Sequence, residues 1–485
     1  MIFYINQQYL NYEIGNLFRI FYPYTELTIT NETTVNADLS VVSNEEKAEI
    51  FVKSTGEKFV LDLTNCQTKN EKEYIVTSNI YKIFEKNTSY SPKWGMLTGI
   101  HPVKLFSEYE KKSNLQNAKE TFKNKFFVSN EKINLSEEIL DIQRPYLKKD
   151  GEKVYSIYIS IPFCPSRCSY CSFVSQSVEK SKKLIEPYFN LLLEEVKHTS
   201  SIVSKLNLTL KSVYIGGGTP TTLSANQIRV LIDTVKENFD MSSCTEFTVE
   251  AGRPDTIDKE KLESIKNANI DRISINPQSL QDNVLEMVGR KHSSKDIIDT
   301  YYLAREIGIK NINMDLIAGL KGDTLESFKD TLDKIIYLNP ENITIHSLAL
   351  KRSANIFTQE DTQSYHSKSD SVTQMVDYSI EKLKENAYIP YYLYRQSRMA
   401  GNAENTGWAK KDSICAYNIY TMDESHTVIA CGAGGVSKIV DPYSNRLERI
   451  FNFKYAYEYI NRFDEIIKRK DEVISLYEQF CKRLY

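Results

Sequence analysis

Residues 161–171 read Ile-Pro-Phe-Cys-Pro-Ser-Arg-Cys-Ser-Tyr-Cys, and they directly follow the apolar run Val154–Ile161, which predicts a buried β-strand. Three of the eight cysteines in the chain, Cys164, Cys168 and Cys171, therefore lie in one short loop with the spacing Cys-x3-Cys-x2-Cys. An odd set of thiols cannot pair completely as disulfides. We interpret this segment as a metal-binding loop at the carboxyl end of a strand.

Two kinds of metal centre take cysteine ligands of this type. A structural zinc ion almost always takes four protein ligands. The nearest candidates after the loop, His198 and Cys244, do not form a second ligand pair. Three thiolates instead suit a [4Fe-4S] cubane, in which they hold three irons and leave the fourth iron open to an exogenous ligand. The spacing favours the cluster over zinc.

Strands and helices alternate along the chain from this loop onward. Apolar runs of strand length are followed by longer amphipathic stretches, and the hydrophobic period changes from 2 to 3.6 about six times. This pattern predicts an α/β fold with a parallel sheet, as a partial (β/α)6 barrel over residues 151–370 whose chemistry lies at the carboxyl ends of the strands. The predicted strands are Val154–Ile161, Ser212–Ile215, Glu246–Glu250, Arg272–Ile275, Asn311–Ile317 and Asn342–His346, and the predicted helices are Glu179–Lys197, Ser224–Asn238, Ser294–Gly308 and Thr324–Tyr337.

Two further parts flank the predicted barrel. In residues 1–150, the runs at 50–52 and 59–63 predict a hairpin, and residues 108–125 predict a charged helix, so we expect an N-terminal α+β accessory module that ends at Gly151. Residues 371–485 are predicted to form a C-terminal accessory domain. It contains predicted helices at 372–386 and 456–470, an aromatic segment at 391–394 and a glycine-rich run at 431–435.

Composition sets outer limits on the function. The chain has 485 residues, 41% of them hydrophobic and 26% charged, which is typical of a globular protein of several domains. Its formal net charge of -3 argues against a nucleic-acid binder that works through a basic surface. No run of apolar residues is long enough to span a membrane as a helix, and the N-terminus does not read as a signal peptide. We expect a cytoplasmic protein.

The cysteine loop resembles the signature of radical S-adenosylmethionine (SAM) enzymes. With Tyr158–Phe163 ahead of it, it is similar to the oxygen-independent coproporphyrinogen III oxidase (coproporphyrinogen dehydrogenase) family. The blocks 94–104, 250–255 and 394–396 resemble a long Firmicutes-type subgroup of that family. The resemblance implies a [4Fe-4S] cluster held by Cys164, Cys168 and Cys171. Its open iron would be chelated by the amino and carboxylate groups of SAM, which one electron splits into methionine and a 5′-deoxyadenosyl radical.

The resemblance also implies which residues contact SAM. A glycine run lets the backbone approach a ligand closely, although a tight turn would also explain one. A single carboxylate at a strand end is more often a helix cap or salt bridge, but several such positions at successive strand ends favour a ligand site. Carboxylates suit ribose hydroxyls, and a guanidinium suits the methionine carboxylate. The expected SAM-contacting residues are Tyr158, Tyr170, Gly217, Gly218, Thr219, Glu250, Gln278, Arg290, Asp315, Ile317 and Ala349.

The expected function follows from the same resemblance. We predict a radical SAM oxidoreductase of haem and porphyrin biosynthesis that converts propionates of coproporphyrinogen III to vinyl groups, towards protoporphyrinogen IX, without oxygen. Its partners would be a tetrapyrrole substrate and a low-potential electron donor such as flavodoxin or ferredoxin. A haem-binding chaperone and a radical SAM methyltransferase acting on a tetrapyrrole are the alternatives. One departure from typical family members is Ser160, which stands where they have a histidine.

A few other residues have chemistry that would suit a porphyrin. Arginines can bind propionates bidentately, and histidines can reach a porphyrin, although both are more often ordinary structural residues. Two further cysteines are expected to be buried and inert. These candidates are Arg253, Arg395, Arg398, His101 and His292, and the two cysteines are Cys415 and Cys431.

Overall fold

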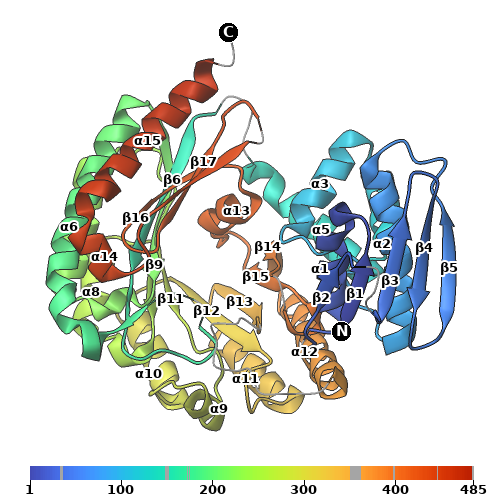
Figure 1. Ribbon diagram of the computed structural model, residues 1–485. Coiled ribbons are helices and arrows are strands. Elements are labelled where there is room, and N and C mark those ends of the chain that lie inside the picture. Colours follow the sequence, from blue (N-terminus) through green and yellow to red (C-terminus); the bar gives the residue numbers. More distant parts are fainter. Residues whose placement is uncertain are drawn as a thin grey trace. The chain divides into compact units, whose positions relative to one another are not determined.

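The computed structural model describes residues 1–482 except 24, 33–35, 148–151, 172, 174, 350–361, 397, 398 and 445. The chain forms two compact units (Figure 1). The first comprises Met1–Glu137, Phe357–Gln374 and Arg395–Glu404, and the second comprises Glu138–Ile356, Met375–Tyr394 and Asn405–Tyr485. The predicted boundary at Gly151 lies outside the described residues, and the division at residues 150 and 370 stays a prediction.

The first unit contains a five-stranded sheet in the order β2-β1-β3-β4-β5. Strands β4 (Lys47–Val52) and β5 (Glu57–Asp62) pair antiparallel, which confirms the predicted hairpin. Gly56 takes a positive φ of 68° in the turn between them, a conformation that glycine adopts without strain. The other strands are β1 (Ile2–Ile5), β2 (Thr28–Thr30) and β3 (Leu39–Ser43), and the helices from this part of the chain are α1 (Asn11–Phe21), α2 (Lys69–Thr88), α3 (Pro102–Lys112), α4 (Leu115–Glu120) and α5 (Asn130–Gln143).

Six parallel strands form the centre of the second unit, and they confirm the six predicted strands. Each strand pairs with the one that follows it in the barrel region, so the winding never reverses direction. Such a singly wound order is that of a barrel rather than of a two-sided open sheet. The strands are β6 (Val154–Ile161), β9 (Thr209–Gly217), β10 (Glu246–Gly252), β11 (Arg272–Ile275), β12 (Asn311–Ala318) and β13 (Asn342–Ser347).

The C-terminal part of the chain extends this sheet at both edges. Strand β16 (Thr427–Cys431) pairs in parallel with β6, and β17 (Val436–Val440) and β18 (Leu447–Phe451) follow antiparallel. At the other edge, β15 (Asn405–Ala409) lies antiparallel between β13 and β14 (Ile389–Tyr394). The eleven-stranded sheet therefore has β14 and β18 as its edge strands, and the barrel is partial.

Helices cover the outer face of the six central strands (Figure 1). Capping boxes at Ser224, Ser293 and Thr324 start three of these helices close to the predicted positions. The predicted helix over 456–470 is instead two helices, because Arg462 leaves the helical conformation with φ −126° and ψ 34°. The helices from residue 178 onward, of which not all lie on that outer face, are α6 (Val178–Lys205), α7 (Ala225–Asn238), α8 (Lys259–Asn267), α9 (Asp282–Met287), α10 (Ser294–Glu306), α11 (Leu325–Leu338), α12 (Thr362–Glu385), α13 (Ala416–Asp423), α14 (Ala456–Asn461) and α15 (Phe463–Lys482).

None of the helices in the described part of the chain is both long enough and apolar enough to cross a membrane.

A buried ion pair fastens the C-terminal helices to α6. Glu195 Oε1 lies 3.0 Å from Lys470 Nζ, and both side chains are almost completely buried. The Tyr459 hydroxyl and the Gly432 backbone N–H each donate to Glu195 Oε2 at 2.6 Å, and Asn452 Nδ2 donates to Oε1 at 2.8 Å. Buried charges are tolerated only when they are paired and hydrogen-bonded in this way. The network therefore holds α6, α14 and α15 against the end of β16.

We expect Glu195→Ala to lower the free energy of unfolding by about 3–5 kcal/mol, because it leaves the Lys470 ammonium buried without its carboxylate. Urea unfolding followed by circular dichroism measures this change. The control is Asp233→Ala, which breaks the exposed pair Arg229–Asp233 and should change the free energy by about 0.5 kcal/mol or less. Equal effects of the two substitutions on the free energy of unfolding would contradict the stabilising role of the buried Glu195–Lys470 pair.

Candidate active site

The cysteine loop begins where β6 ends. Cys164 lies in the two-residue strand β7 (Phe163–Cys164), which pairs in parallel with β8 (Gln176–Ser177) and closes the base of the loop. The backbone N–H of Cys171 donates to the carbonyl of Cys168 at 3.1 Å. Cys168 is buried, and the other two cysteines are half-buried. All three thiols are therefore held at the carboxyl end of the first barrel strand.

The side chains around the cysteines fit thiolate ligands. All three cysteines are free of disulfides, and among the described residues no group of three or more His, Cys, Asp or Glu side chains is arranged as a ready site for a metal ion. Thr219 Oγ1 donates to Cys164 Sγ at 3.5 Å, and Arg253 Nη1 donates to Cys168 Sγ at 3.8 Å. Burial raises the pKa of Cys164 and Cys171, and coordination to a metal deprotonates such thiols. Donors and a cation beside the sulfurs suit an anionic iron–sulfur cluster.

The glycine run after β9 lies directly against the cysteine loop. A Cβ atom on Gly218 would stand 2.6 Å from the carbonyl oxygen of Phe163 and 3.0 Å from Cys164 Sγ. The Gly218 N–H donates to the carbonyl of Ile161 at 2.7 Å, and Gly217 takes a φ of 106°. Only glycine fits this approach without moving the neighbouring backbone. The run is therefore more than a tight turn, because it sets the distance between the first two strand-end loops.

Ser160, the residue that replaces the usual histidine, takes part in the same contact. Its hydroxyl donates to the carbonyl of Ala433 at 2.7 Å, and a Cβ on Gly217 would lie 2.9 Å from its Oγ. The Tyr188 hydroxyl donates to the Ser160 carbonyl at 2.6 Å and accepts from the Ala433 N–H at 2.9 Å. The glycine-rich run at 431–435 is thus fastened to the strand that carries the cysteine loop.

Three stacked tyrosines line the inside of the sheet next to a half-buried carboxyl. The ring centroids of Tyr214 and Tyr417 are 4.5 Å apart, and Tyr158 stacks on Tyr214 at 6.2 Å. The Tyr214 hydroxyl donates to Glu250 Oε1 at 2.6 Å. Burial raises the pKa of Glu250 to about 7, with Asp315 adding to the rise and the Tyr214 hydrogen bond opposing it. Glu250 can therefore change its protonation near neutral pH.

Backbone hydrogen bonds bring three of the predicted SAM residues together. Gln278, which takes a φ of 69°, donates its N–H to the carbonyl of Asp315 at 2.9 Å and accepts from the N–H of Ile317 at 3.0 Å. Burial raises the pKa of Asp315, but His346, 3.7 Å away, and Asn313, which donates at 2.8 Å, outweigh burial and lower it. Asp315 is therefore held as a carboxylate at the end of β12.

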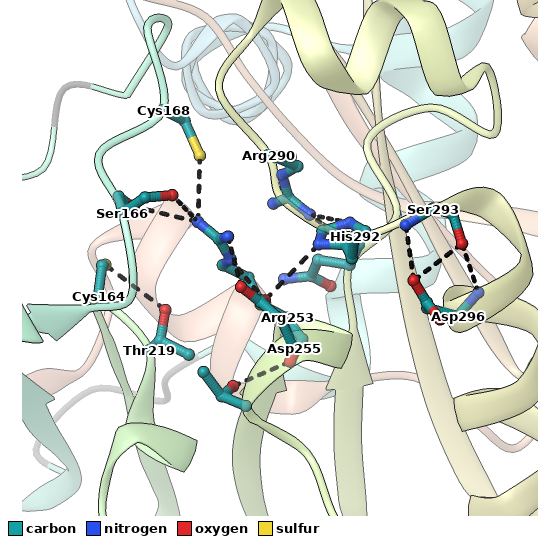
Figure 2. Close-up of polar contacts among 12 residues, drawn as sticks. Cys164, Ser166, Cys168, Thr219, Arg253, Asp255, Arg290, His292, Ser293 and Asp296 are labelled. Carbon is teal, nitrogen blue, oxygen red and sulfur yellow. Dashed lines mark hydrogen bonds and ion pairs between the residues drawn. The ribbon is translucent and has the colours of Figure 1, made fainter.

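Two arginines, an aspartate and a histidine form a connected group beside Cys168 (Figure 2). Arg253 binds Asp255 through two hydrogen bonds, at 2.9 Å and 2.7 Å, and His292 Nδ1 lies 3.6 Å from Asp255 Oδ1. Arg290 lies 3.4 Å from His292 Nε2. Burial raises the pKa of Asp255, but His292 and Arg253 outweigh it and hold that pKa well below its usual range. Burial lowers the pKa of His292, which keeps its ring neutral.

Arg253 and His292 were candidates for contacts with a propionate or a porphyrin. In the structure, both side chains instead contact other residues of this group. The Arg253 guanidinium is buried and binds Asp255, Ser166 and the Cys168 sulfur. Arg290, which we expected to bind the SAM carboxylate, donates to the Tyr170 hydroxyl at 3.1 Å and to the carbonyl of Asn276 at 2.6 Å. Two of the predicted SAM residues, Arg290 and Tyr170, are therefore hydrogen-bonded to each other at the cysteine loop.

The remaining candidates take no part in the contacts described so far. Ala349 is half-buried just after β13. Arg395 lies in the first unit, where it is buried and donates to the carbonyl of Leu97 at 2.6 Å. His101 also belongs to the first unit, and Arg398 lies outside the described residues. The two cysteines expected to be inert, Cys415 and Cys431, are buried.

Tyr214 and Asp255 are among the residues of the site that were not singled out from the sequence. Tyr214 stands two positions before Gly216 on β9, so strand alternation alone places it on the face of the glycine run. Asp255 is two residues after Arg253, across a short 3-10 turn at Pro254–Thr256. The turn is only three residues long, so no pattern of apolar and polar residues predicts the contact between Arg253 and Asp255.

Comparison with known proteins gives the family. A family model described as the radical SAM superfamily matches residues 158–335. The oxygen-independent coproporphyrinogen-III oxidase-like protein HemZ of Bacillus subtilis is 33% identical over 494 residues, 99% of this chain and 98% of that protein. The heme chaperone HemW of Bacillus subtilis is 37% identical over 197 residues, 40% of this chain and 51% of the chaperone. Coproporphyrinogen III oxidase (HemN) from Escherichia coli has a TM-score of 0.52 at 22% identity, covering 68% of this chain and 73% of that one.

The chain belongs to the radical SAM superfamily and, within it, to the oxygen-independent coproporphyrinogen-III oxidase-like family. The structural likeness confirms the predicted α/β radical SAM partial barrel. Membership brings a [4Fe-4S] cluster and SAM as cofactors. The individual SAM contacts stay predictions.

The raised pKa of Glu250 predicts how stability changes with pH. Because its folded-state pKa of about 7 lies above the ordinary 4.5, the folded chain binds more protons between these values, and stability falls as the pH rises through them. Glu250→Gln removes this titration. Between pH 5 and pH 8 we expect the wild type to lose roughly 2–3 kcal/mol more than Glu250→Gln, measured by urea unfolding at each pH. Parallel pH profiles for the two proteins would exclude a raised pKa at this carboxyl.

Proposed function

We propose, from this family membership, that the chain catalyses the oxygen-independent oxidative decarboxylation of coproporphyrinogen III. Loss of a β-hydrogen, CO2 and one electron would convert a propionate side chain to a vinyl group. The observation that carries the proposal is the similarity to the oxidase-like protein of Bacillus subtilis over 99% of this chain. A match of that length includes the N-terminal and C-terminal parts outside the barrel. We expect these parts to determine which substrate is bound.

The proposed cluster ligands are Cys164, Cys168 and Cys171. When bound, the cluster and SAM supply a 5′-deoxyadenosyl radical that abstracts hydrogen from carbon. The chain's own part is to hold SAM in one orientation and to keep water away from the reacting atoms. The residues proposed to contact SAM are Tyr158, Tyr170, Gly217, Gly218, Thr219, Glu250, Gln278, Arg290, Asp315, Ile317 and Ala349.

The charges at the strand ends support this assignment. Asp315 is held as a carboxylate by His346 and Asn313, so it can accept hydrogen bonds from ribose hydroxyls or pair with a cationic group of SAM. Glu250 Oε1 accepts a hydrogen bond from the Tyr214 hydroxyl, and Oε2 lies towards the glycine run, since a Cβ on Gly216 would lie 3.0 Å from it. Both groups stand at the carboxyl ends of barrel strands, where ligands of such barrels bind.

A haem chaperone is the second candidate. The chain is 37% identical to the heme chaperone of Bacillus subtilis over 197 residues, a higher identity than to the oxidase-like protein but over a much shorter part of the chain. A chaperone would bind haem with the same barrel and cluster and leave coproporphyrinogen unchanged. We favour the oxidase because its similarity extends along the whole chain.

The test is an anaerobic assay of the full chain, reconstituted with iron and sulfide, with SAM, dithionite and coproporphyrinogen III. Mass spectrometry should show the loss of one or two CO2 units, each with its two hydrogens, in step with 5′-deoxyadenosine. Cys168→Ala should abolish both products, because the cluster loses one of its three thiolates. The control Cys244→Ala removes a half-buried thiol outside the cysteine loop and should leave both rates unchanged.

Other outcomes of this assay separate the candidates. If the porphyrinogen stays unchanged and a haem titration of the same protein shows stoichiometric binding, the chaperone replaces the oxidase as the proposed function. S-adenosylhomocysteine together with a methylated tetrapyrrole would replace it by a methyltransferase. Full turnover by Cys168→Ala would contradict the ligand assignment itself.

A further inference from the structure

Arg253 contacts the cysteine loop, although it is not among the residues expected to contact SAM. Its guanidinium is 4% exposed, and Nη1 donates to Cys168 Sγ at 3.8 Å and to the Ser166 hydroxyl at 2.9 Å (Figure 2). Nε and Nη2 both bind the Asp255 carboxylate. The side chain therefore has little freedom to move, and one end of it is fixed against a sulfur atom.

The charges around Cys168 do not cancel. Arg290 is also buried near this thiol, where it binds the Tyr170 hydroxyl and the carbonyl of Asn276. Asp255 is the carboxylate that neutralises Arg253, and the histidine next to it is neutral because burial lowers its pKa. Two guanidinium groups and one carboxylate leave a net positive charge beside the sulfur. In a buried place such a charge acts strongly on its neighbours.

A positive charge and a hydrogen bond at a ligand sulfur both favour the reduced form of an iron–sulfur cluster. Reduction adds one electron, and hence one negative charge, without breaking a bond, and arginine keeps its proton throughout. The electron comes from an external low-potential donor. We infer that Arg253, held in place by Asp255, sets the one-electron reduction potential of the cluster through its contact with Cys168. This inference rests on the proposed ligand assignment of the three cysteines.

The geometry makes Arg253 a positioning residue for the cluster rather than a substrate ligand. A propionate would have to displace Asp255, which already occupies the two parallel donors of the guanidinium. It would also have to reach a side chain that is almost entirely buried. The same two donors hold Nη1 in the direction of the sulfur, and the negative charge of Asp255 offsets part of the Arg253 charge there.

The experiment is a potentiometric titration of the full-length reconstituted chain with dithionite, followed by electron paramagnetic resonance of the reduced cluster. At the midpoint potential of the wild-type cluster, Arg253→Gln should lower the ratio of reduced to oxidised cluster about tenfold. This corresponds to a midpoint potential lower by about 59 mV for a one-electron couple. Arg253→Lys keeps the charge and should recover part of the shift. Asp255→Asn removes the neutralising charge and should shift the ratio upward, roughly threefold, because the carboxylate is farther from the sulfur than the arginine is.

Arg253→Gln and Asp255→Asn should shift the midpoint potential in opposite directions. A general loosening of the cysteine loop would instead shift it in the same direction in both variants. The control Arg229→Gln removes an exposed arginine and should leave the midpoint unchanged. An unchanged midpoint in Arg253→Gln at full iron content would overturn the inference. If Arg253→Gln fails to assemble a cluster, Asp255→Asn decides alone, and a downward or absent shift overturns the inference. A wild-type chain without a cluster signal would instead refute the ligand assignment.

Discussion

The site depends on the close packing of two loops at the carboxyl ends of β6 and β9. Because β6 and β9 pair with Ile161 opposite Gly217, the glycine run is forced onto the backbone that leads into Cys164. A side chain on Gly218 would meet the Phe163 carbonyl at 2.6 Å. Only residues without a Cβ allow this approach, and it places the Thr219 hydroxyl within 3.5 Å of the Cys164 sulfur. The cysteine loop, the glycine run and the hydroxyl therefore form one rigid edge.

Buried charges then give this edge its chemistry. Burying an ion is costly unless partners compensate it, and each buried charge near the cysteines has hydrogen-bond partners. Asp315 is satisfied by Asn313 and His346, and Arg253 is satisfied by Asp255. Glu250 has only the neutral Tyr214 hydroxyl as a hydrogen-bond partner, and burial raises its pKa to about 7 although that hydrogen bond opposes the rise. The site is thus prepared for a charged ligand before any ligand is bound.

Sequence patterns predicted the barrel strands well, and the contacts between distant segments poorly. Strands buried on both faces read as apolar runs, so β6 and β11 were predicted with their observed ends. The pairing of β16 with β6 joins residues more than 250 positions apart, and no local periodicity encodes it. Arg253 was recognised as a candidate, but with a propionate as its expected partner. Its true partners, Asp255 and Cys168, come from a three-residue turn and from a loop about 85 positions earlier.

We propose above that this edge directs radical chemistry at the propionates of a tetrapyrrole. Coproporphyrinogen III carrying deuterium at the β-carbons of its propionates tests it most directly. Under anaerobic turnover with SAM and a reductant, we expect 5′-deoxyadenosine that contains one deuterium for each CO2 released. If the 5′-deoxyadenosine contains no deuterium while the porphyrinogen stays intact, the proposed function is wrong and the barrel acts on another substrate.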